Sequence, residues 1–483
     1  MNERMNTSCG QGVFCLPAVL LSDLQLDRIL GAQTLGILQK PCDGETRRAR
    51  LEIFAALEDP TCHLCAERCL SALTQLQRTW ELWREAKIPL DKYHLEAVLM
   101  DACLNAFEAL DALSHCDPRL ALSASAFGAG EWQGLLTRMR EDHHRLTVLL
   151  ERMHIGLLSM ADKLWLTPDR EAVSEREQIA ACAREMGLVP PSAQKRSIRV
   201  DMTLSDAVCR LYADEVSQIE TICDSYAGVA WGEMIACIPE LRFYLDICGL
   251  LRRAEARGIP HCIPSEAASP QYTARELYDI SLLAKECERI VPNDVSFTEQ
   301  EPFAFLIGAN GGGKTTYLRA VGLNLVLFLA GCPVFAREAV MYPFARIYSH
   351  FPRDERFDRT GRLDEEQERV ARMLADAAGH ETFLLFNETF SGTDDVRGFD
   401  LLRDAVKKAG EAGHFGLFVT HFHEVMTLDV PVLSAQVDSE DKNKRTYRIH
   451  KTKGTASSFA ADILRKYRLD RESLRGRRGN DGN

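Results

Sequence analysis

One glycine-rich segment has the residue types and the spacing that bind phosphate. Residues 308–315 read Gly-Ala-Asn-Gly-Gly-Gly-Lys-Thr, which is a complete G-x-x-x-x-G-K-[ST] pattern. In such a loop the glycines let backbone N–H groups turn towards phosphate oxygens, and the start of the following helix adds the positive end of its dipole. The lysine reaches the β- and γ-phosphates, and the last hydroxyl binds Mg²⁺. The segment therefore predicts ATP and Mg²⁺ as cofactors.

The flanks of this segment agree with a phosphate loop. The apolar run 303–307 before it has the length and composition of a buried strand, and residues 316–330 after it carry apolar side chains at helical spacing. A phosphate loop requires this strand, loop and helix context. The alternative, a glycine-rich turn that contains a lysine by chance, does not explain the flanks. The residues expected around the phosphates are Gly308, Ala309, Asn310, Gly311, Gly312, Gly313, Lys314, Thr315 and Thr316.

A second apolar run ends in two polar residues that fit the same site. Residues 382–386 have the composition of a buried parallel strand, and Asn387 and Glu388 follow them. In phosphate-loop enzymes a strand of this kind delivers an acid towards Mg²⁺, and a following glutamate orients or deprotonates the attacking water. We expect Thr315 and Asn387 at the metal. Lys314 and Glu388 are the expected catalytic groups. The alternative is a buried strand that simply ends at polar residues.

Asn387 stands where an aspartate is usual in such enzymes. An amide oxygen can still hold a water molecule bound to Mg²⁺, but the substitution removes one negative charge from the metal site. We therefore expect an ATPase in which nucleotide binding survives better than turnover.

The length and composition are those of a globular protein. The 483 residues are 46% hydrophobic and 27% charged, and they allow two to four domains. No stretch approaches the roughly 18 uninterrupted apolar residues of a membrane-spanning helix. Residues 1–6 lack the basic and apolar order of a secretory signal. The 16 cysteines are scattered, so reduced and mostly buried thiols are expected, in a cytoplasmic protein with no membrane partner.

The charge of the chain bears on nucleic-acid binding. A net charge of −12 argues against a protein that holds nucleic acid through a broad basic surface. A local basic channel remains open. Residues 471–483 form a locally basic tail, for which a solvated, frayed segment is the simpler interpretation.

One cysteine cluster has a spacing that metal sites use. Cys62, Cys65 and Cys69 lie close together, with His63 between the first two. A structural zinc site needs four ligands, however, and no second C-x₂-C or H-x₃-H follows. The three cysteines also share one face of a helix that continues through Leu73. Core packing is therefore the favoured interpretation.

The chain divides into a helical half and a nucleotide half. Residues 1–45 show little periodicity and are expected to be a loosely structured lead-in. Residues 46–265 have the spacing of long helices, with Gly and Pro at the joints, and predict an all-α domain of lever or bundle type. Residues 260–270 are the best linker candidate, and a short helix is expected over 274–288. An α/β phosphate-loop domain is predicted over residues 271–470, before the basic tail.

Six segments in order resemble the MutS-type DNA mismatch repair ATPases, over the predicted phosphate-loop domain. They are residues 291–295, 308–319, 331–336, 387–398, 420–424 and 447–459. The resemblance implies an ABC-like, MutS-type ATPase fold for this domain, and a helical lever domain before it. It also implies a homodimer formed through the ATPase domain and DNA as a partner.

The resemblance implies further site residues. Ile290 and Val291 would pack against the adenine ring. His421 would sense the γ-phosphate or the attacking water, where a neutral imidazole offers both a donor and an acceptor. Without the resemblance, His421 fits equally well as a polar residue at a strand end. His450 would flank the base, although its spacing to Gly454 is one residue short.

Two departures from the family pattern bear on function. The family's S-G-R-S-T-F-x-x-E stretch, which acts across the dimer, is similar to residues 360–368, where the Gly-Arg pair and Glu368 keep the register. Leu363 and Asp364 replace the two hydroxyls, and an aspartate there would repel a γ-phosphate. The mismatch-reading module, with its Phe-x-Glu wedge, has no place before the helical half. A short form of the family is therefore expected.

Two functions of different classes fit these observations. The first is an ATP-gated DNA-binding clamp, a dimer whose helical levers move around DNA in mismatch repair or related DNA transactions. The second is an ATP-binding interaction or regulatory protein that keeps the nucleotide switch without mismatch recognition. The acidic charge, the missing wedge and Asn387 favour the second. A small-molecule kinase on a phosphate loop would not explain the long helical block.

Overall fold

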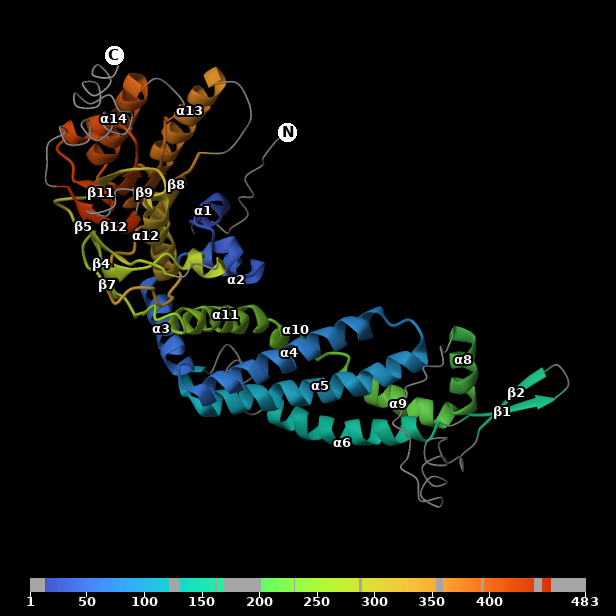
Figure 1. The fold of residues 1–483 in the computed structure, drawn as a ribbon. Coiled ribbons are helices and arrows are strands. Elements are labelled where there is room, and N and C mark those ends of the chain that lie inside the picture. The colour runs from blue at the N-terminus through green and yellow to red at the C-terminus, as the bar shows by residue number, and fades with distance from the viewer. Residues whose placement is uncertain are drawn as a thin grey trace, which may run out of the picture. The chain divides into compact units, whose positions relative to one another are not determined.

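The structure divides into two compact units, one made of residues 1–55 with 246–483 and the other of residues 56–245 (Figure 1). We call them the nucleotide unit and the helical unit. Helices α3 (Gly44–Leu57) and α11 (Ile238–Glu255) run across the sequence boundaries between the units. The computed structural model describes residues 14–120, 131–153, 155–160, 163–168, 201–229, 231–285, 289–352, 359–391, 395–437 and 445–452.

The helical unit is built on two long helices that pack side by side, α4 (Pro60–Glu85) and α5 (Pro89–Cys116). Helix α4 begins where the Asp59 carboxylate accepts hydrogen bonds from the backbone N–H groups two and three residues further on. A proline at the first helical position assists this start, because it needs no N–H partner. The other helices that the structure describes in this unit are η2 (Pro118–Leu120), α6 (Glu131–Glu151), α8 (Met202–Leu211), α9 (Ala213–Tyr226) and α10 (Trp231–Ile235).

The helical unit also contains strands, where the sequence predicted helices only. Strand β1 (Ile155–Met160) pairs antiparallel with β2 (Lys163–Pro168). The expectation of an all-α domain over residues 46–265 is therefore wrong for β1 and β2. Each strand has only six residues, which is too short to interrupt the helical spacing of apolar residues in the surrounding sequence. No helix in the described part of the chain has the combined length and apolar character that a membrane crossing requires.

The cysteines of α4 belong to the packing of the helical unit. Cys62 and Cys69 are buried, and Leu73 and Leu76 continue the same buried face. Among the residues that the structure describes, no three His, Cys, Asp or Glu side chains are grouped so as to hold a metal ion. The burial of these side chains agrees with core packing.

The nucleotide unit is organised around a six-stranded sheet with the order β12-β11-β6-β10-β9-β8. Neighbouring strands are parallel except β12, which runs antiparallel to β11. The order places β10 between β6 and β9, so the expected phosphate-loop strand and the strand before Asn387 end at one edge. The strands are β6 (Phe303–Ile307), β8 (Arg346–His350), β9 (Thr382–Asn387), β10 (Phe415–Val419), β11 (Val432–Val437) and β12 (Arg445–Lys451). The helices that accompany them are α12 (Lys314–Leu329), α13 (Arg359–Ala377), α14 (Asp395–Glu411) and η5 (His423–Thr427).

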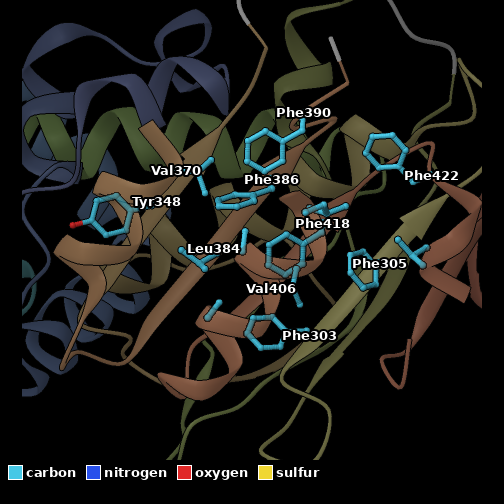
Figure 2. Packing of buried hydrophobic residues seen from close by; sticks show 14 of the residues in the cluster. Phe303, Phe305, Tyr348, Val370, Leu384, Phe386, Phe390, Val406, Phe418 and Phe422 are labelled. Carbon is cyan, nitrogen blue, oxygen red and sulfur yellow. The ribbon is translucent and has the colours of Figure 1, made fainter. Parts of the chain in front are cut away.

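Aromatic side chains fill the core on one side of this sheet (Figure 2). Phe418 of β10 is central, because it touches rings from both neighbouring strands. Its ring centroid lies 5.1 Å from that of Phe386 at an interplanar angle of 87°, and 5.8 Å from that of Phe305. Leu363 of α13 and Phe390 belong to the same buried cluster. The core therefore connects α13 to the strands that carry the expected site.

A second, four-stranded sheet corrects two expectations. Its order is β3-β7-β4-β5, and a 3-10 helix, η4 (Ile280–Ala284), follows β4. The helix expected over 274–288 is wrong, because residues 274–277 belong to β4 and residues 280–284 form η4. The linker expected over 260–270 is also ordered, since Cys262 pairs with Val334 and Ala267 is buried. The strands are β3 (Ser265–Glu266), β4 (Tyr272–Leu277), β5 (Asn293–Phe297) and β7 (Glu338–Met341).

The N-terminal residues are structured where the sequence predicted a loose lead-in. Residues 18–38 form α1 (Ala18–Asp23), η1 (Leu26–Arg28) and α2 (Ala32–Leu38). Leu24 is fully buried, and its side chain lies so close to Gly322 of α12 that a Cβ there would clash. These elements are too short to show a helical spacing of apolar residues in the sequence. They are buried by residues that are distant in the sequence.

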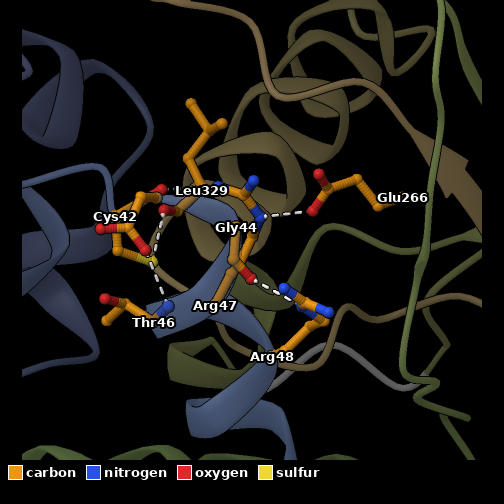
Figure 3. Close-up of polar contacts among 8 residues, drawn as sticks. Cys42, Gly44, Thr46, Arg47, Arg48, Glu266 and Leu329 are labelled. Atoms are coloured by element: carbon orange, nitrogen blue, oxygen red, sulfur yellow. Dashed lines mark hydrogen bonds and ion pairs between the residues drawn. The ribbon is translucent and has the colours of Figure 1, made fainter.

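The far end of α12 is held by residues at the start of α3 (Figure 3). The backbone N–H of Cys42 donates to the Leu329 carbonyl at 2.9 Å, and its thiol donates to the same oxygen at 3.3 Å. The Arg50 guanidinium donates to the next carbonyl, that of Ala330, at 2.7 Å. Arg47 lies over the Phe328 ring and pairs with Glu266 at 3.0 Å. Cationic groups thus neutralise the negative end of the α12 dipole, which has no basic residue in its own last turn.

Candidate nucleotide site

The loop between β6 and α12 has a backbone that only glycine adopts easily. Gly308 and Gly313 have φ angles of 134° and 92°, in the region that L-residues avoid. Gly312 is required for a different reason, because a Cβ there would lie 2.9 Å from the Ala309 carbonyl oxygen. Gly313 is also the residue from which α12 starts. The sequence motif is therefore formed as a compact turn at the N-terminus of a buried helix, which is the geometry that phosphate-binding loops use.

The Lys314 side chain lies over this loop. Its ammonium donates hydrogen bonds to the carbonyl oxygens of Gly308 at 2.8 Å and Ala309 at 3.4 Å, and to the side chain of Asn310 at 3.3 Å. Burial lowers the pKa of Lys314, and the carboxylate of Glu388, 4.0 Å away, opposes that change. A partly desolvated cation beside a turn of backbone N–H groups attracts an anion of high charge density.

The end of β9 meets the start of α12. The Thr315 hydroxyl donates to the Asn387 side-chain oxygen at 3.2 Å, across 72 positions of sequence. Asn387 is only 9% exposed, so this amide is held within the site. A hydroxyl and an amide oxygen are neutral oxygen donors that suit Mg²⁺, which keeps several of its own waters in such sites. The donor set therefore fits the cation, with less charge than a carboxylate would supply.

Glu388 begins a strained turn after β9. Its φ angle is 49°, which is unusual for a residue with a side chain, and Phe390 follows with a φ angle of 64°. The Glu388 N–H donates to the Val419 carbonyl at 2.8 Å, which joins this turn to the end of β10. The Glu388 side chain is 35% exposed, so solvent reaches the carboxylate. A carboxylate in this position can accept a proton from a water molecule at the mouth of the site.

His421 lies two residues beyond the last residue of β10. It is exposed, and its ring packs against Phe422 with the centroids 4.3 Å apart. The Val419 carbonyl bonds to the turn of Glu388, and the Thr420 N–H donates to Leu306 of β6 at 3.1 Å. The end of β10 therefore contacts both the turn after β9 and the strand before the phosphate loop. His421 therefore belongs to the same edge of the sheet as Glu388.

The segment expected at the adenine lies beside an aromatic residue that the sequence analysis missed. Ile290 and Val291 are half-buried just before β5. Asn293 at the start of β5 accepts from the Ile449 N–H at 2.7 Å and donates to the Tyr447 carbonyl at 3.0 Å. Tyr447 has a φ angle of 57° and is 48% exposed. The sequence offered one signal for Tyr447, because it is an aromatic residue three positions before His450. Only His450 was considered as a residue that flanks the base.

Tyr447 lies directly against the phosphate loop. The nearest atom of its ring is 3.4 Å from the position that a Cβ on Gly313 would take. An exposed aromatic face beside the start of α12 can stack on a planar ring of a bound molecule.

Two acidic residues of helix α13 differ in burial and in their contacts. Glu368, which the sequence pattern matched to the family, is exposed and pairs with Arg372 of the next turn at 3.4 Å. Glu366 is 6% exposed, and its carboxylate accepts a hydrogen bond from the Phe390 N–H at 3.1 Å. Leu363 is buried in the core and Asp364 is exposed. Thus the buried acid that reaches the turn of Glu388 is Glu366, which the sequence analysis missed.

Other expected features fall outside the described residues. These are the tail over 471–483 and Gly454, together with the side chain of Arg362. The expected site residues of the phosphate loop, of the end of β9 and of the end of β10 all lie along one edge of the main sheet.

Comparison with known proteins gives a consistent family. Residues 304–463 match the family model described as MutS domain V. The DNA mismatch repair protein MutS of Lysinibacillus sphaericus (strain C3-41) is 31% identical over 199 residues, which are 38% of this chain and 22% of the relative. The DNA mismatch repair protein msh-2 of Neurospora crassa is 32% identical over 246 residues, 47% of this chain and 24% of the relative. The matched part thus spans about a quarter of the length of these curated relatives.

Proposed function

Because this chain belongs to the MutS family through residues 304–463, we propose that it binds ATP with Mg²⁺ and hydrolyses ATP at the site described above. The observation that carries the proposal is that the phosphate loop meets the end of β9. The Thr315 hydroxyl lies 3.2 Å from the Asn387 side-chain oxygen, and the Lys314 ammonium lies 4.0 Å from the Glu388 carboxylate. Two sequence motifs that lie far apart in the chain thereby meet at one edge of the main sheet, with groups for phosphate, metal and water.

The proposed roles follow from the position and chemistry of each group. The loop N–H groups and Lys314 bind the phosphates, and Lys314 exchanges its carbonyl partners for phosphate oxygens. Thr315 and Asn387 hold Mg²⁺, which when bound neutralises charge on the phosphates. Glu388 orients the attacking water and accepts its proton. His421 reports on the γ-phosphate from the end of β10.

The adenine side of the proposed site is formed by Ile290, Val291 and Tyr447. The two aliphatic side chains offer an apolar surface, and the exposed Tyr447 ring beside Gly313 offers a stacking surface. These contacts hold the base without charge, so they contribute to affinity and leave the chemistry to the phosphate end.

The role of the whole protein is a further part of the proposal. Because the relatives are named as DNA mismatch repair proteins, we propose a dimer, formed through the nucleotide unit, that grips DNA when ATP is bound. The second candidate is an ATP-dependent interaction protein that does not hold DNA. The net charge of −12 and the neutral Asn387 favour this second candidate.

Four measurements test these proposals in order. Calorimetry with ATP and Mg²⁺, followed by phosphate release, tests nucleotide binding and turnover. Light scattering with and without ATP tests the dimer, and retention on DNA at several salt concentrations then separates the two candidates. A DNA-gripping dimer requires ATP-dependent retention that falls with salt. An ATP-dependent dimer that passes through the DNA column unretained supports the interaction protein.

A further inference from the structure

The turn that carries Glu388 is conformationally costly. Both Glu388 and Phe390 have positive φ angles, and neither is glycine. Such a backbone persists only where surrounding contacts determine it, and functional sites are where such strain is found. The position of the Glu388 carboxylate therefore depends on the groups that hold residues 388–391.

Among the residues that the structure describes, four contacts with other elements hold the backbone, the Thr389 hydroxyl and the Phe390 ring of this turn. The Glu388 N–H bonds to Val419, as described above. The Thr389 hydroxyl is hydrogen-bonded to His350 Nδ1 at 3.0 Å, in a buried position. The Phe390 ring is 1% exposed in the aromatic core. The fourth contact is the Glu366 carboxylate, which accepts from the Phe390 N–H and is the one negatively charged side chain among the four.

We propose that Glu366 is a positioning residue for hydrolysis, which fixes the turn of residues 388–391 so that Glu388 faces the attacking water. This inference rests on the proposed ATPase function. A buried carboxylate that accepts a backbone N–H forms a strong, charge-assisted hydrogen bond. Loss of that acceptor leaves the Phe390 N–H buried and unsatisfied, so the strained turn relaxes. Helix α13 thereby contributes to the hydrolytic site, although the Glu366 side chain itself touches no substrate.

The chain supplies a matched control two residues away. Glu368 is on the same helix and has the same charge, but it is exposed and pairs with Arg372. Helix propensity and net charge change equally in Glu366→Ala and Glu368→Ala. Any difference between the variants therefore reports the contact with Phe390.

The kinetic test compares Glu366→Ala, Glu366→Gln and Glu368→Ala in the full chain. We expect Glu366→Ala to lower kcat by roughly 10- to 100-fold, the effect of a misplaced catalytic group, with KM and ATP affinity nearly unchanged. Glu366→Gln keeps an acceptor oxygen and should recover much of the rate. Adding Glu366→Ala to Glu388→Gln should cost nothing more, because the first residue acts through the second. A full additional loss in the double variant, or equal losses in the two alanine variants, would overturn the proposal.

Hydrogen exchange separates this proposal from the proposed ATPase function. In the protein without nucleotide, amide exchange in a peptide that contains Phe390 should be faster in Glu366→Ala and unchanged in Glu368→Ala. If the wild-type chain shows no turnover, the ATPase proposal fails, and the exchange result still decides whether Glu366 holds the turn. Equal exchange in wild type and Glu366→Ala would refute the positioning role.

A second inference comes from a cysteine pair in the helical unit. Cys65, near the start of α4, and Cys116, the last residue of α5, have their sulfur atoms 3.2 Å apart. Cys116 is exposed and Cys65 is half-buried, so a small molecule can reach the pair from the Cys116 side. The hydrogen bond with Cys116 raises the pKa of the Cys65 thiol, and the charge of Arg68, one turn after Cys65, opposes that change. A disulfide needs a separation of about 2 Å, which rotation of the two side chains can provide.

We infer that Cys65 and Cys116 form a reversible disulfide that joins the start of α4 to the end of α5. The oxidant is a low-molecular-weight disulfide. The Cys116 thiolate attacks one of its sulfurs and releases one small thiol, and Cys65 then attacks the mixed disulfide and releases the second. Two protein S–H bonds are replaced by one S–S bond, and the two protons leave on the two small thiols. The neighbouring Cys62, whose thiol also contacts Cys116, is buried and is the competing partner.

Peptide mapping of the full chain in glutathione buffers tests this pair. We expect a Cys65–Cys116 crosslink that dithiothreitol reverses, and in Cys65→Ser a glutathione adduct that persists on Cys116. Cys103→Ser, a buried position on the same helix, is the control and should keep the crosslink. Crosslinking mainly through Cys62, or a glutathione adduct on Cys116 that persists in the wild type, would refute the assignment.

Discussion

The ammonium of Lys314 lies 4.0 Å from the carboxylate of Glu388, at the point where the phosphate loop meets the end of β9. Burial alone would lower the pKa of Lys314, and Glu388 counteracts part of that change. The pair therefore keeps a desolvated cation in place for phosphate and brings the proposed water-activating group to the same spot. The variants below test this pair, its metal-side neighbour and a buried acid of the helical unit.

Lys314→Ala should abolish measurable ATP binding. The backbone donors of the loop cannot replace an ammonium that pairs with the β- and γ-phosphates. Calorimetry with ATP and Mg²⁺ provides the measurement. Lys407→Ala removes an exposed lysine of α14 that pairs with Glu411, and serves as the charge-matched control with unchanged affinity. Normal ATP affinity in a folded Lys314→Ala protein would remove the phosphate-loop assignment.

Glu388→Gln should leave ATP binding largely intact and lower turnover by roughly 10²- to 10⁴-fold, the usual contribution of a positioned general base. The amide keeps the size of the side chain but cannot accept the proton. Phosphate release under saturating ATP measures the effect, and Glu411→Gln, at an exposed position of α14, is the control. If the wild type turns over and Glu388→Gln does so equally fast, the proton acceptor is another residue.

Asn387→Asp should raise ATPase activity and lower the Mg²⁺ concentration needed for half-maximal activation. Hard cations favour carboxylate over amide oxygens, and the new charge would lie beside the Thr315 hydroxyl. Without metal, repulsion from Glu388 should make the substituted protein somewhat less stable. A Mg²⁺ titration of both proteins is the measurement. A variant that is no faster and needs at least as much Mg²⁺ would place Asn387 outside the metal site.

Glu96 should make the helical unit less stable as the pH rises. Burial raises the pKa of this α5 residue from 4.5 to about 7, although Lys92 opposes the shift. Between these pH values the folded protein binds a proton that the unfolded chain has lost. Stability is therefore fully present below pH 4.5, falls as the pH rises towards 7, and is constant above that. The loss is up to about 3 kcal/mol of unfolding free energy.

Glu96→Gln isolates this effect. The variant should lose the fall in stability between pH 4.5 and 7 and should exceed the wild type at pH 8. Tryptophan fluorescence during urea unfolding is a suitable measurement, because all five tryptophans belong to the helical unit. Glu108→Gln, an exposed position of the same helix, is the control. Parallel pH profiles for wild type and Glu96→Gln would show that Glu96 is ionised in the folded protein at neutral pH.

The phosphate loop could be recognised in the sequence because its chemistry is local. Phosphate binding needs a few N–H groups, a lysine and a hydroxyl within eight consecutive residues, and the flanking strand and helix leave their own periodic patterns. The strand that ends at Asn387 was equally predictable from the sequence. It is a continuous apolar run, as expected for a parallel strand that is buried on both faces of its sheet. The strands expected at 303–307 and 382–386 are confirmed.

Only the tertiary structure decided which distant residues complete the site. Glu366 and Glu368 are the same residue type two positions apart, and they point to different sides of α13, so a sequence pattern with an uncertain register cannot tell which is buried. The N-terminal leucines were missed for a related reason. Their elements are too short to show a period, and Leu24 is buried by α12, almost 300 residues further along the chain. The sequence determines local chemistry through spacing, whereas long-range packing selects the side chains that reach it.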